Sequence, residues 1–433
     1  MSATLAPVAA LLLSVAMLLM GNGLQGTLLP VRAQLEAFSA LDIGVLGSAY
    51  FLGFALGCFF GPHVVRRVGH IRAFAAMVSV ASTISLAHAL ILTPAVWWVL
   101  RAGTGFCFAA LYLVIESWLN ERSTNQTRGL VFSVYTIVNL TVITIGQMML
   151  TLDSPRTFAL FALASILVSL AAVPVALTTA AAPRPPAIVR IRPRYLYRLS
   201  PVGFVGCFAV GLVNSSFWAL GPIFAQREEG DVTAVAVFMS LTVIAGAAGQ
   251  WPLGRASDRV DRRKVIVLAC VGSALAATGL MLSSQFWPPG FYVFAALFGF
   301  FTFPLYSLCA AHMNDYVEPD GYVAAASGLL LVFGAGAVLG PLLASAVMRA
   351  VGVDQLFGYT AVVLMSTAAF TLYRMRQRAR APEKERVEFA DSIRMSQTVS
   401  AVDPLSHEGD EDQPPAPPTP PPDAEAAATP KRD

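Results

Sequence analysis

Two ionisable side chains, Arg101 and Glu116, lie inside one long apolar segment of the sequence, between residues 95 and 118. A charge in such a segment is costly and usually faces protein or water instead of lipid. The planar guanidinium of Arg101 could bind a carboxylate or phosphate through two hydrogen bonds. A buried Glu116 could carry a proton. Two alternatives stay open, because Arg101 could reach the membrane interface or brace helices, and Glu116 could be a water-exposed group at a helix end.

Polar and aromatic side chains in other apolar segments could surround a small organic molecule by hydrogen bonding and stacking. Asn22 and Gln25 are three residues apart, so they share a helix face. Asn214 and Trp218 do the same at a spacing of four. The alternatives are hydrogen bonding between helices for the asparagines and packing for the tyrosines. The candidate binding residues are Arg101, Asn22, Gln25, Tyr112, Asn214, Trp218 and Tyr306.

Twelve apolar segments must position these side chains, and each is long enough to cross a membrane as a helix of about 20 residues. Only 13% of the 433 residues are charged and 56% are hydrophobic, whereas a soluble domain is usually about a quarter charged. The segments are too long and uniform for the strands of a membrane barrel. The sequence therefore predicts an all-α membrane protein. The segments are 8–30, 42–65, 73–92, 95–118, 130–150, 158–179, 201–224, 232–253, 265–285, 290–311, 323–347 and 354–373.

The distribution of Lys and Arg predicts how the helices are oriented. With the C-terminal tail left out, fifteen of them lie in the loops after even-numbered segments and four in the loops after odd-numbered segments. Positive side chains collect in cytoplasmic loops. We therefore expect a multi-pass inner-membrane protein with both termini in the cytoplasm. The first segment has no preceding Lys or Arg, so it is interpreted as a membrane span and not as a cleaved signal peptide.

Several classes of function are disfavoured by the sequence. All five cysteines lie in apolar segments, where they behave as small apolar side chains. None of the three lysines lies in a phosphate-binding loop, and the motifs H-E-x-x-H and G-x-S-x-G do not occur. We therefore expect no enzymatic activity, no direct coupling to ATP, no metal, no cofactor and no nucleic-acid partner.

The two sets of six segments align with each other at a nearly constant offset, which indicates an internal repeat. The offset is 192 for two pairs in the first and seventh segments and 194 for three pairs in later segments. We therefore predict two pseudo-symmetric bundles of six helices. The pairs are Asn22 with Asn214, Pro30 with Pro222, Gly105 with Gly299, Tyr112 with Tyr306, and Gly146 with Gly340.

The repeat and the composition together predict the division of the chain. Residues 1–179 form the first bundle and residues 201–375 the second. Residues 180–200 carry four prolines and five arginines, a composition typical of a polar connector. Residues 376–433 are polar and rich in proline, and we expect them to form a disordered cytoplasmic tail.

The loop between the eighth and ninth segments carries a recognisable motif. Residues 254–264 read GRASDRVDRRK. This resembles the signature G-x-x-x-D-R-x-G-R-R of the major facilitator superfamily, with Asp261 in place of the second Gly. A tight turn that carries a carboxylate and a row of cations could lock the cytoplasmic ends of the bundles. The matching loop of the first half departs further, with Pro62 for the first Gly and Arg66 for the acid.

Further motifs agree with this resemblance. Residues 101–105 read RAGTG, similar to the family's R-x-x-Q-G with Thr104 in place of Gln. Glu121 and Arg128 match an E…RG pattern of sugar-porter-like members. Gln147 stands where drug exporters of the family commonly have Pro, which disfavours drug antiport. The phrase YLVIES at 112–117 looks like the YcaD-like bacterial branch.

The resemblance implies a fold and a function. The fold is that of the superfamily, with the first, fourth, seventh and tenth helices around a central cavity. The function is secondary transport by alternating access. We expect a small polar or anionic organic solute coupled to protons, with Glu116 as the proton-coupling residue and a monomer in the lipid bilayer as the working form. The alternatives are efflux of lipophilic drugs and a membrane sensor that does not transport.

The resemblance also implies a gate at the cytoplasmic face. Glu121 is expected near Arg67 or Arg72, and Asp315 near Arg259 or Arg262. Such ion pairs would bias the balance between inward-facing and outward-facing states. The candidate gate residues are Arg67, Arg72, Glu121, Arg128, Asp258, Arg259, Arg262 and Asp315.

Overall fold

The computed structural model describes residues 8–123, 127–177, 188–189, 193–287, 290–318, 321–377, 389 and 401–402. Within these residues, twelve helical spans are long and apolar enough to cross a membrane, as predicted. The first half contains α2 (Ala9–Leu35), α3 (Ala40–Val68), α4 (His70–Leu90), α5 (Pro94–Arg122), α6 (Arg128–Met148) with η2 (Met149–Leu152), and α7 (Ala159–Leu170) with α8 (Ala172–Ala176). The second half contains α10 (Pro201–Glu229), α11 (Val232–Arg259), α12 (Arg262–Phe286), α13 (Gly290–Thr302), α14 (Pro304–Asn314), α15 (Tyr322–Val351) and α16 (Gln355–Gln377).

Two of the spans are interrupted, and proline accounts for both breaks. Pro304 begins α14, and Pro174 lies within the short helix α8. Proline has no backbone N–H and its ring disturbs the preceding turn, so the hydrogen-bond ladder of the helix is broken there. Each pair of short helices, α7 with α8 and α13 with α14, makes one membrane span.

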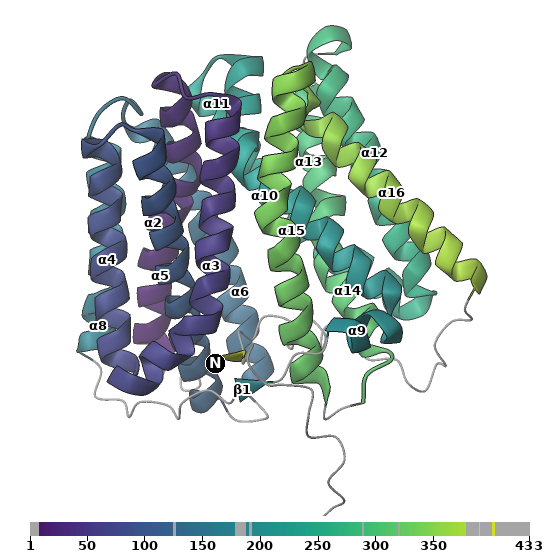
Figure 1. Ribbon diagram of the computed structural model, residues 1–433, viewed down its shortest axis with the longest axis horizontal. Helices are drawn as coiled ribbons and strands as arrows, with labels where there is room; N and C mark the ends of the chain where they lie inside the picture. Colours follow the sequence, from purple (N-terminus) through teal and green to yellow (C-terminus); the bar gives the residue numbers. More distant parts are fainter. Residues whose placement is uncertain are drawn as a thin grey trace, which may run out of the picture.

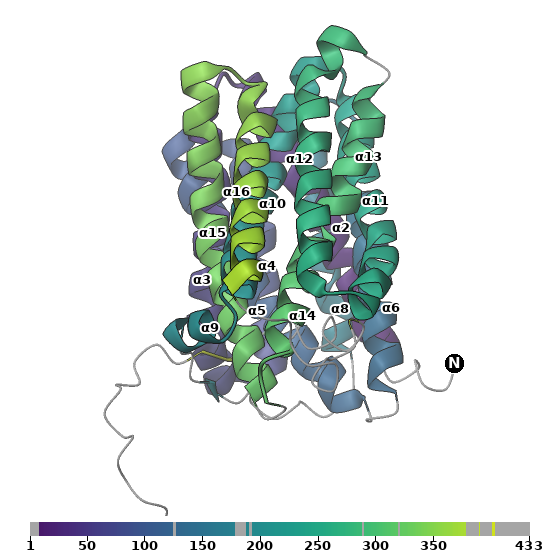
Figure 2. The same ribbon diagram turned by 90° about the vertical axis from the view of Figure 1, so that its right-hand side faces the viewer.

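The two halves form two bundles that lie side by side. Figure 1 shows α3, α4 and α5 on one side and α12, α15 and α16 on the other. Figure 2, turned by 90°, shows α12, α13, α15 and α16 running along the long direction of the bundle, with the connector helix α9 (Pro193–Leu199) at one end. The short strand β1 (Ile188–Val189) lies at this same end and pairs in parallel with β2 (Ala401–Val402). Most of the predicted connector and tail lies outside the described residues.

Close helix contacts repeat between the halves and confirm the internal repeat. A Cβ atom at Gly105 on α5 would collide with the backbone carbonyl of Tyr50 on α3. At the matching place in the second half, a Cβ at Gly299 would collide with the carbonyl of Thr242. Gly299 is offset from Gly105 by 194 residues, and Thr242 is offset from Tyr50 by 192. Both halves therefore use glycine to bring the same pair of helix backbones together.

Replacement of Gly105 by Ala should destabilise the fold, because the atom in its way is backbone and cannot rotate aside. Overpacking of this kind typically costs about 1–3 kcal/mol. A matched control is Gly334→Ala, since a Cβ there meets nothing within 4 Å and Ala favours helix over Gly by about 1 kcal/mol. We expect Gly105→Ala to lower the melting temperature of the purified protein and Gly334→Ala to leave it equal or higher. Equal behaviour of the two variants would contradict the contact.

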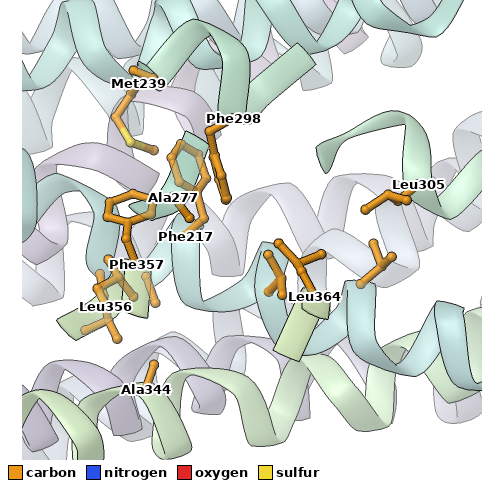
Figure 3. Close-up of a cluster of buried hydrophobic side chains, with 14 of the residues drawn as sticks. Phe217, Met239, Ala277, Phe298, Leu305, Ala344, Leu356, Phe357 and Leu364 are labelled. Carbon is orange, nitrogen blue, oxygen red and sulfur yellow. The ribbon is translucent and has the colours of Figure 1, made fainter. Parts of the chain in front are cut away.

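The core of the second half is built from aromatic rings (Figure 3). Phe217 on α10 lies 5.8 Å from Phe298 on α13, centroid to centroid, and Phe298 lies 5.2 Å from Phe357 on α16. Met239 of α11 lies beside these rings and is fully buried. Aromatic pairs add about 0.5–1.5 kcal/mol each beyond the area that they bury. This cluster holds α10 in place, and α10 contributes one wall of the cavity described below.

The halves meet at the end of the bundle opposite α9 and β1. A Cβ at Gly44 on α3 would collide with Ser345 on α15, and a Cβ at Gly47 would collide with Ala219 on α10. On the other side of the interface, the Ser240 hydroxyl on α11 lies 3.5 Å from Oε1 of Gln147 on α6. The two bundles are thus packed together at this end.

Candidate functional site

A cavity of about 410 Å³ lies between the two halves. It is bounded by α2, α3, α5 and α6 of the first half and by α10 and α15 of the second. The lining residues are Asn22, Gly23, Gly26, Leu29, Pro30, Ile43, Leu46, Gly47, Tyr50, Phe51, Phe54, Ala55, Cys58, Phe59, Arg101, Tyr112, Ile143, Trp218, Ala219, Ser327, Leu330, Leu331, Phe333 and Gly334. Its volume falls within the range of about 300–1,000 Å³ typical of small-molecule sites.

Arg101 is the one charged side chain among the described residues that line this cavity. Its guanidinium carbon lies 4.3 Å from the centroid of the Tyr50 ring, a cation–π contact. One terminal nitrogen, Nη1, is buried and has no hydrogen-bond partner in the described structure. The Tyr50 ring therefore contacts the face of the guanidinium, and Nη1 at its edge remains available to donate a hydrogen bond.

The cavity brings together four of the seven predicted binding residues, namely Arg101, Asn22, Tyr112 and Trp218. The Oδ1 atom of Asn22 is also buried without a partner in the described part of the chain. These residues come from α2, α5 and α10, so three helices far apart in sequence converge on one space.

The other three predicted residues are not among those that line this cavity. The Tyr306 ring packs against Phe333 at 5.4 Å, so it supports a lining residue from behind. Gln25 is buried on α2 with only 2% of its surface exposed. The Oδ1 atom of Asn214 is buried on α10. Spacing along one helix could not show which face turns to the cavity, because that depends on the neighbouring helices.

Sequence reasoning missed the contribution of α3, above all Tyr50. The residues considered came from the first, fourth, seventh and tenth spans, whereas Tyr50, Phe51 and Phe54 lie in the second. Phe54 contacts the Tyr112 ring with centroids 6.1 Å apart. The available signal was a run of aromatic residues at helical spacing in an otherwise aliphatic and Gly-rich span.

Glu116 lies behind the cavity wall and not at its surface. It is buried on α5, with 5% of its surface exposed. It is close enough to Cys58 and Tyr112, which both line the cavity, to interact with them electrostatically, and it interacts with Tyr135 on α6 in the same way. A buried carboxyl group thus lies near the residues of the cavity wall.

A cluster of charged side chains lies at the loop between α11 and α12, apart from the cavity. Nε of Arg262 lies 3.1 Å from the Asp315 carboxylate, and both side chains are almost fully buried. Arg262 also pairs with Asp258 at 3.1 Å. The backbone N–H of Phe389 donates to the same Asp258 carboxylate at 3.0 Å, and the Phe389 ring lies against Gly254. The expected proximity of Asp315 to Arg262 is therefore present.

Asp261, which departs from the family signature, has a structural role in this loop. Its side chain accepts a hydrogen bond from the Arg263 backbone N–H at 3.1 Å and caps the start of α12. It also forms an ion pair with the Arg263 guanidinium at 2.8 Å. Burial alone would raise the pKa of Asp261, but the hydrogen bonds and charge of Arg263 outweigh it and the pKa is lowered.

The matching loop of the first half is arranged differently. Among the described residues, no ion pair is present between Glu121 and either Arg67 or Arg72, and all three side chains are exposed. The Arg128 side chain lies outside the described residues, and Arg259 is exposed. Among the described residues of these two loops, the buried ion pairs thus lie in the second half, where the signature is nearly complete.

The sequence matches the family profile of the Major Facilitator Superfamily over residues 11–286 and 203–407, which together cover most of the chain. The chain belongs to the major facilitator superfamily. Its twelve spans and its two six-helix bundles are those of an MFS transporter, as predicted. Of the four spans expected around the central cavity, the first, fourth and seventh line it, whereas the tenth contributes none of its described lining residues.

Two similar MFS proteins come from enteric bacteria. The Escherichia coli protein named "Uncharacterized MFS-type transporter YcaD" (strain UMN026) is 26% identical over 361 residues, or 82% of this chain and 93% of that protein. An uncharacterized MFS-type transporter of Enterobacter sp. strain 638 is also 26% identical, over 84% of this chain and 93% of its own length. The likeness to the YcaD-like branch is thereby confirmed.

Solved structures show the same MFS fold at much lower identity. The nucleoside transporter NupG superposes with a TM-score of 0.74 at 12% identity and covers 86% of this chain and 99% of its own. A D-xylose–proton symporter gives a TM-score of 0.65 at 12% identity, with 87% and 98% covered. A bacterial homologue of the human lysosomal transporter Spinster gives 0.70 at 16% identity, with 88% and 97% covered.

Proposed function

We propose that this MFS transporter is a proton-coupled carrier of a small organic anion, which binds to Arg101 in the central cavity. The observation that carries the proposal is the position of Arg101, which is charged, lines the cavity and has a buried nitrogen without a partner in the described structure. A negative group placed at this edge would accept a charge-assisted hydrogen bond.

A charged side chain inside the membrane carries an energetic cost. An arginine at the centre of a span costs about 2.5–3.5 kcal/mol on insertion scales, and less towards the ends. The contact with Tyr50 returns about 0.5–2 kcal/mol. Water in the empty cavity, or an anion in the loaded cavity, can offset the part of this cost that the contact with Tyr50 leaves. The side chain therefore favours a ligand with the opposite charge.

Alternating access is supported by the asymmetry of the packing. The halves touch at Gly44 and Gly47, at the end opposite α9 and β1. The cavity wall continues past Arg101 to Cys58, Phe59 and Ser327, on the side of α9 and β1. The arginine-rich loops lie at that end and favour a cytoplasmic location for it. We therefore propose that the structure represents a state closed to the outside. Both termini are then cytoplasmic, and the monomer in the inner membrane is the transporting unit.

Replacement of Glu116 by Gln should uncouple transport from protons. Gln keeps the shape of the side chain but cannot release a proton, so a pH gradient should no longer drive substrate accumulation. Exchange of labelled for unlabelled substrate needs no net proton movement and should persist. We expect accumulation to fall to near background in proteoliposomes, with exchange retained.

The control for this experiment is Glu229→Gln, an exposed carboxylate at the end of α10. It should accumulate substrate as the unmodified protein does. Accumulation by Glu116→Gln at the unmodified level would show that another group carries the proton. Failure of all variants and of the unmodified protein to move any organic anion would overturn the proposed function itself and favour a sensor on the same fold.

Efflux of lipophilic compounds is the second candidate, and the apolar cavity wall favours it. Leu330, Leu331 and Phe333 of α15 and Trp218 of α10 present no charge to the cavity. The two functions differ in their dependence on charge. An exporter of lipophilic compounds would transport charged and uncharged compounds of similar shape equally well. A carrier that binds its substrate through Arg101 would transport only the compound with the negative group.

A further inference from the structure

We infer that the transported anion is a monocarboxylate with a flat apolar body, such as an aromatic acid. This inference rests on the proposed function and specifies its substrate class. Its basis is the composition of the cavity lining, in which Arg101 is the one charged side chain among the described residues and aromatic and aliphatic side chains from both halves make up most of the remainder.

The charged end of the cavity accommodates one negative group. Arg101 is the one cation among the described lining residues. A second carboxylate on the same ligand would be moved from water into the cavity without a countercharge, and burial of an unpaired charge is strongly unfavourable. A phosphate monoester carries about 1.5–2 negative charges at neutral pH and meets the same difficulty. The site therefore favours a single carboxylate.

The aromatic part of the lining suits a flat apolar body. Trp218 stacks on Phe303 with centroids 6.1 Å apart and the ring planes at 23°, and it contacts Phe217 edge-on at 5.8 Å. Phe333 is backed by Tyr306. These supporting rings fix the two lining rings, so the wall can contact a ligand without losing much side-chain freedom.

A strongly hydroxylated substrate fits this cavity poorly. A sugar buries several hydroxyl groups, and each buried hydroxyl without a partner costs about 1–3 kcal/mol. The described lining offers few polar side chains beyond Asn22, Tyr50, Tyr112 and Ser327, and Leu, Ile, Phe and Gly make up most of the remainder. The aromatic and aliphatic lining rewards apolar contact instead.

The inference can be tested with four probes on the purified protein. They are 3-phenylpropanoate, its uncharged amide 3-phenylpropanamide, the polar monoanion lactate and the dianion phenylsuccinate. Binding is measured by calorimetry. We expect 3-phenylpropanoate to bind most tightly, and each of the other three to bind at least about tenfold more weakly.

The outcomes separate the inference from the function on which it rests. If lactate binds as tightly as 3-phenylpropanoate, the apolar body is irrelevant and the inference fails, while anion recognition stands. If the amide binds as tightly as 3-phenylpropanoate, charge is irrelevant and the proposed function fails. Equal binding of phenylsuccinate would overturn the restriction to one carboxylate. Absence of binding by 3-phenylpropanoate would overturn the inference.

A pair of tryptophan variants tests the wall directly. Trp218→Leu keeps an apolar side chain but removes the flat ring. It should weaken the binding of 3-phenylpropanoate by about tenfold and change the binding of lactate little. The matched control is Trp251→Leu on α11, whose side chain is 72% exposed and contacts Arg255. The control should bind both probes as the unmodified protein does. An unchanged affinity of Trp218→Leu for 3-phenylpropanoate would remove Trp218 from the site and overturn the inference.

Discussion

Transport should be lost when Arg101 is replaced by Ala. The variant removes the one charge among the described residues of the cavity wall, and charged hydrogen bonds contribute about 1.5–3 kcal/mol each. A carboxylate bound through both of its oxygens would lose two such bonds, which corresponds to at least about a 100-fold weaker affinity. Arg101→Lys should show an intermediate effect, because it keeps the charge but loses the planar fork. Uptake of a carboxylate into proteoliposomes measures both.

Equal protein levels and folding are required for this comparison. Arg349→Ala, at an exposed position near the end of α15, is the control and should transport normally. Arg101 also stacks on Tyr50, so the melting temperature of each variant should be recorded. Normal carboxylate uptake by Arg101→Ala would show that the side chain is a structural anchor, and the preference for an anion would lose its main support.

The second large effect is expected at the buried ion pair of Arg262 and Asp315. Removal of one partner from a buried pair costs about 3–5 kcal/mol, because the remaining charge is left in a poorly solvated place. Arg262 keeps its contact with Asp258 in the Asp315→Asn variant. We therefore expect this variant to lose about 3 kcal/mol of unfolding free energy, near the lower end of that range. The measurement is thermal unfolding of the purified variant in detergent.

Asp258→Asn is the matched comparison, since it removes the other carboxylate on Arg262. The Asp258 side chain is 34% exposed, compared with 3% for Asp315, and partly solvated pairs contribute only about 0–1 kcal/mol. The Asp315 variant should therefore unfold at a clearly lower temperature than the Asp258 variant. Equal effects would mean that burial does not set the strength of this network.

The gate function proposed for these charges is separate from their effect on stability. The pair of Arg262 and Asp315 joins α12 to the end of α14, inside the second half. The packing between halves lies elsewhere, at Gly44 and Gly47. We therefore propose that the charge network fixes the shape of the second bundle, so that this bundle moves as one body during alternating access.

The sequence by itself determined the membrane spans and the repeat, and it singled out Arg101 as a candidate site residue. Spans follow from length and apolarity, because the backbone must satisfy its own hydrogen bonds in lipid. The repeat is visible because both halves require glycine where helix backbones touch, as at Gly105 and Gly299. Arg101 could be singled out because a charge within a membrane span is costly, whichever direction its helix face points.

Only the tertiary structure decided which faces of these helices meet. It placed Tyr50 of α3 over Arg101, and it placed Tyr306 behind Phe333 and not in the cavity wall. It also paired Asp315 with an arginine while leaving its counterpart Glu121 exposed. The physical reason is that side-chain spacing fixes directions relative to one helix axis. The rotation and approach of the neighbouring helices, which depend on contacts far apart in sequence, determine where those directions lead.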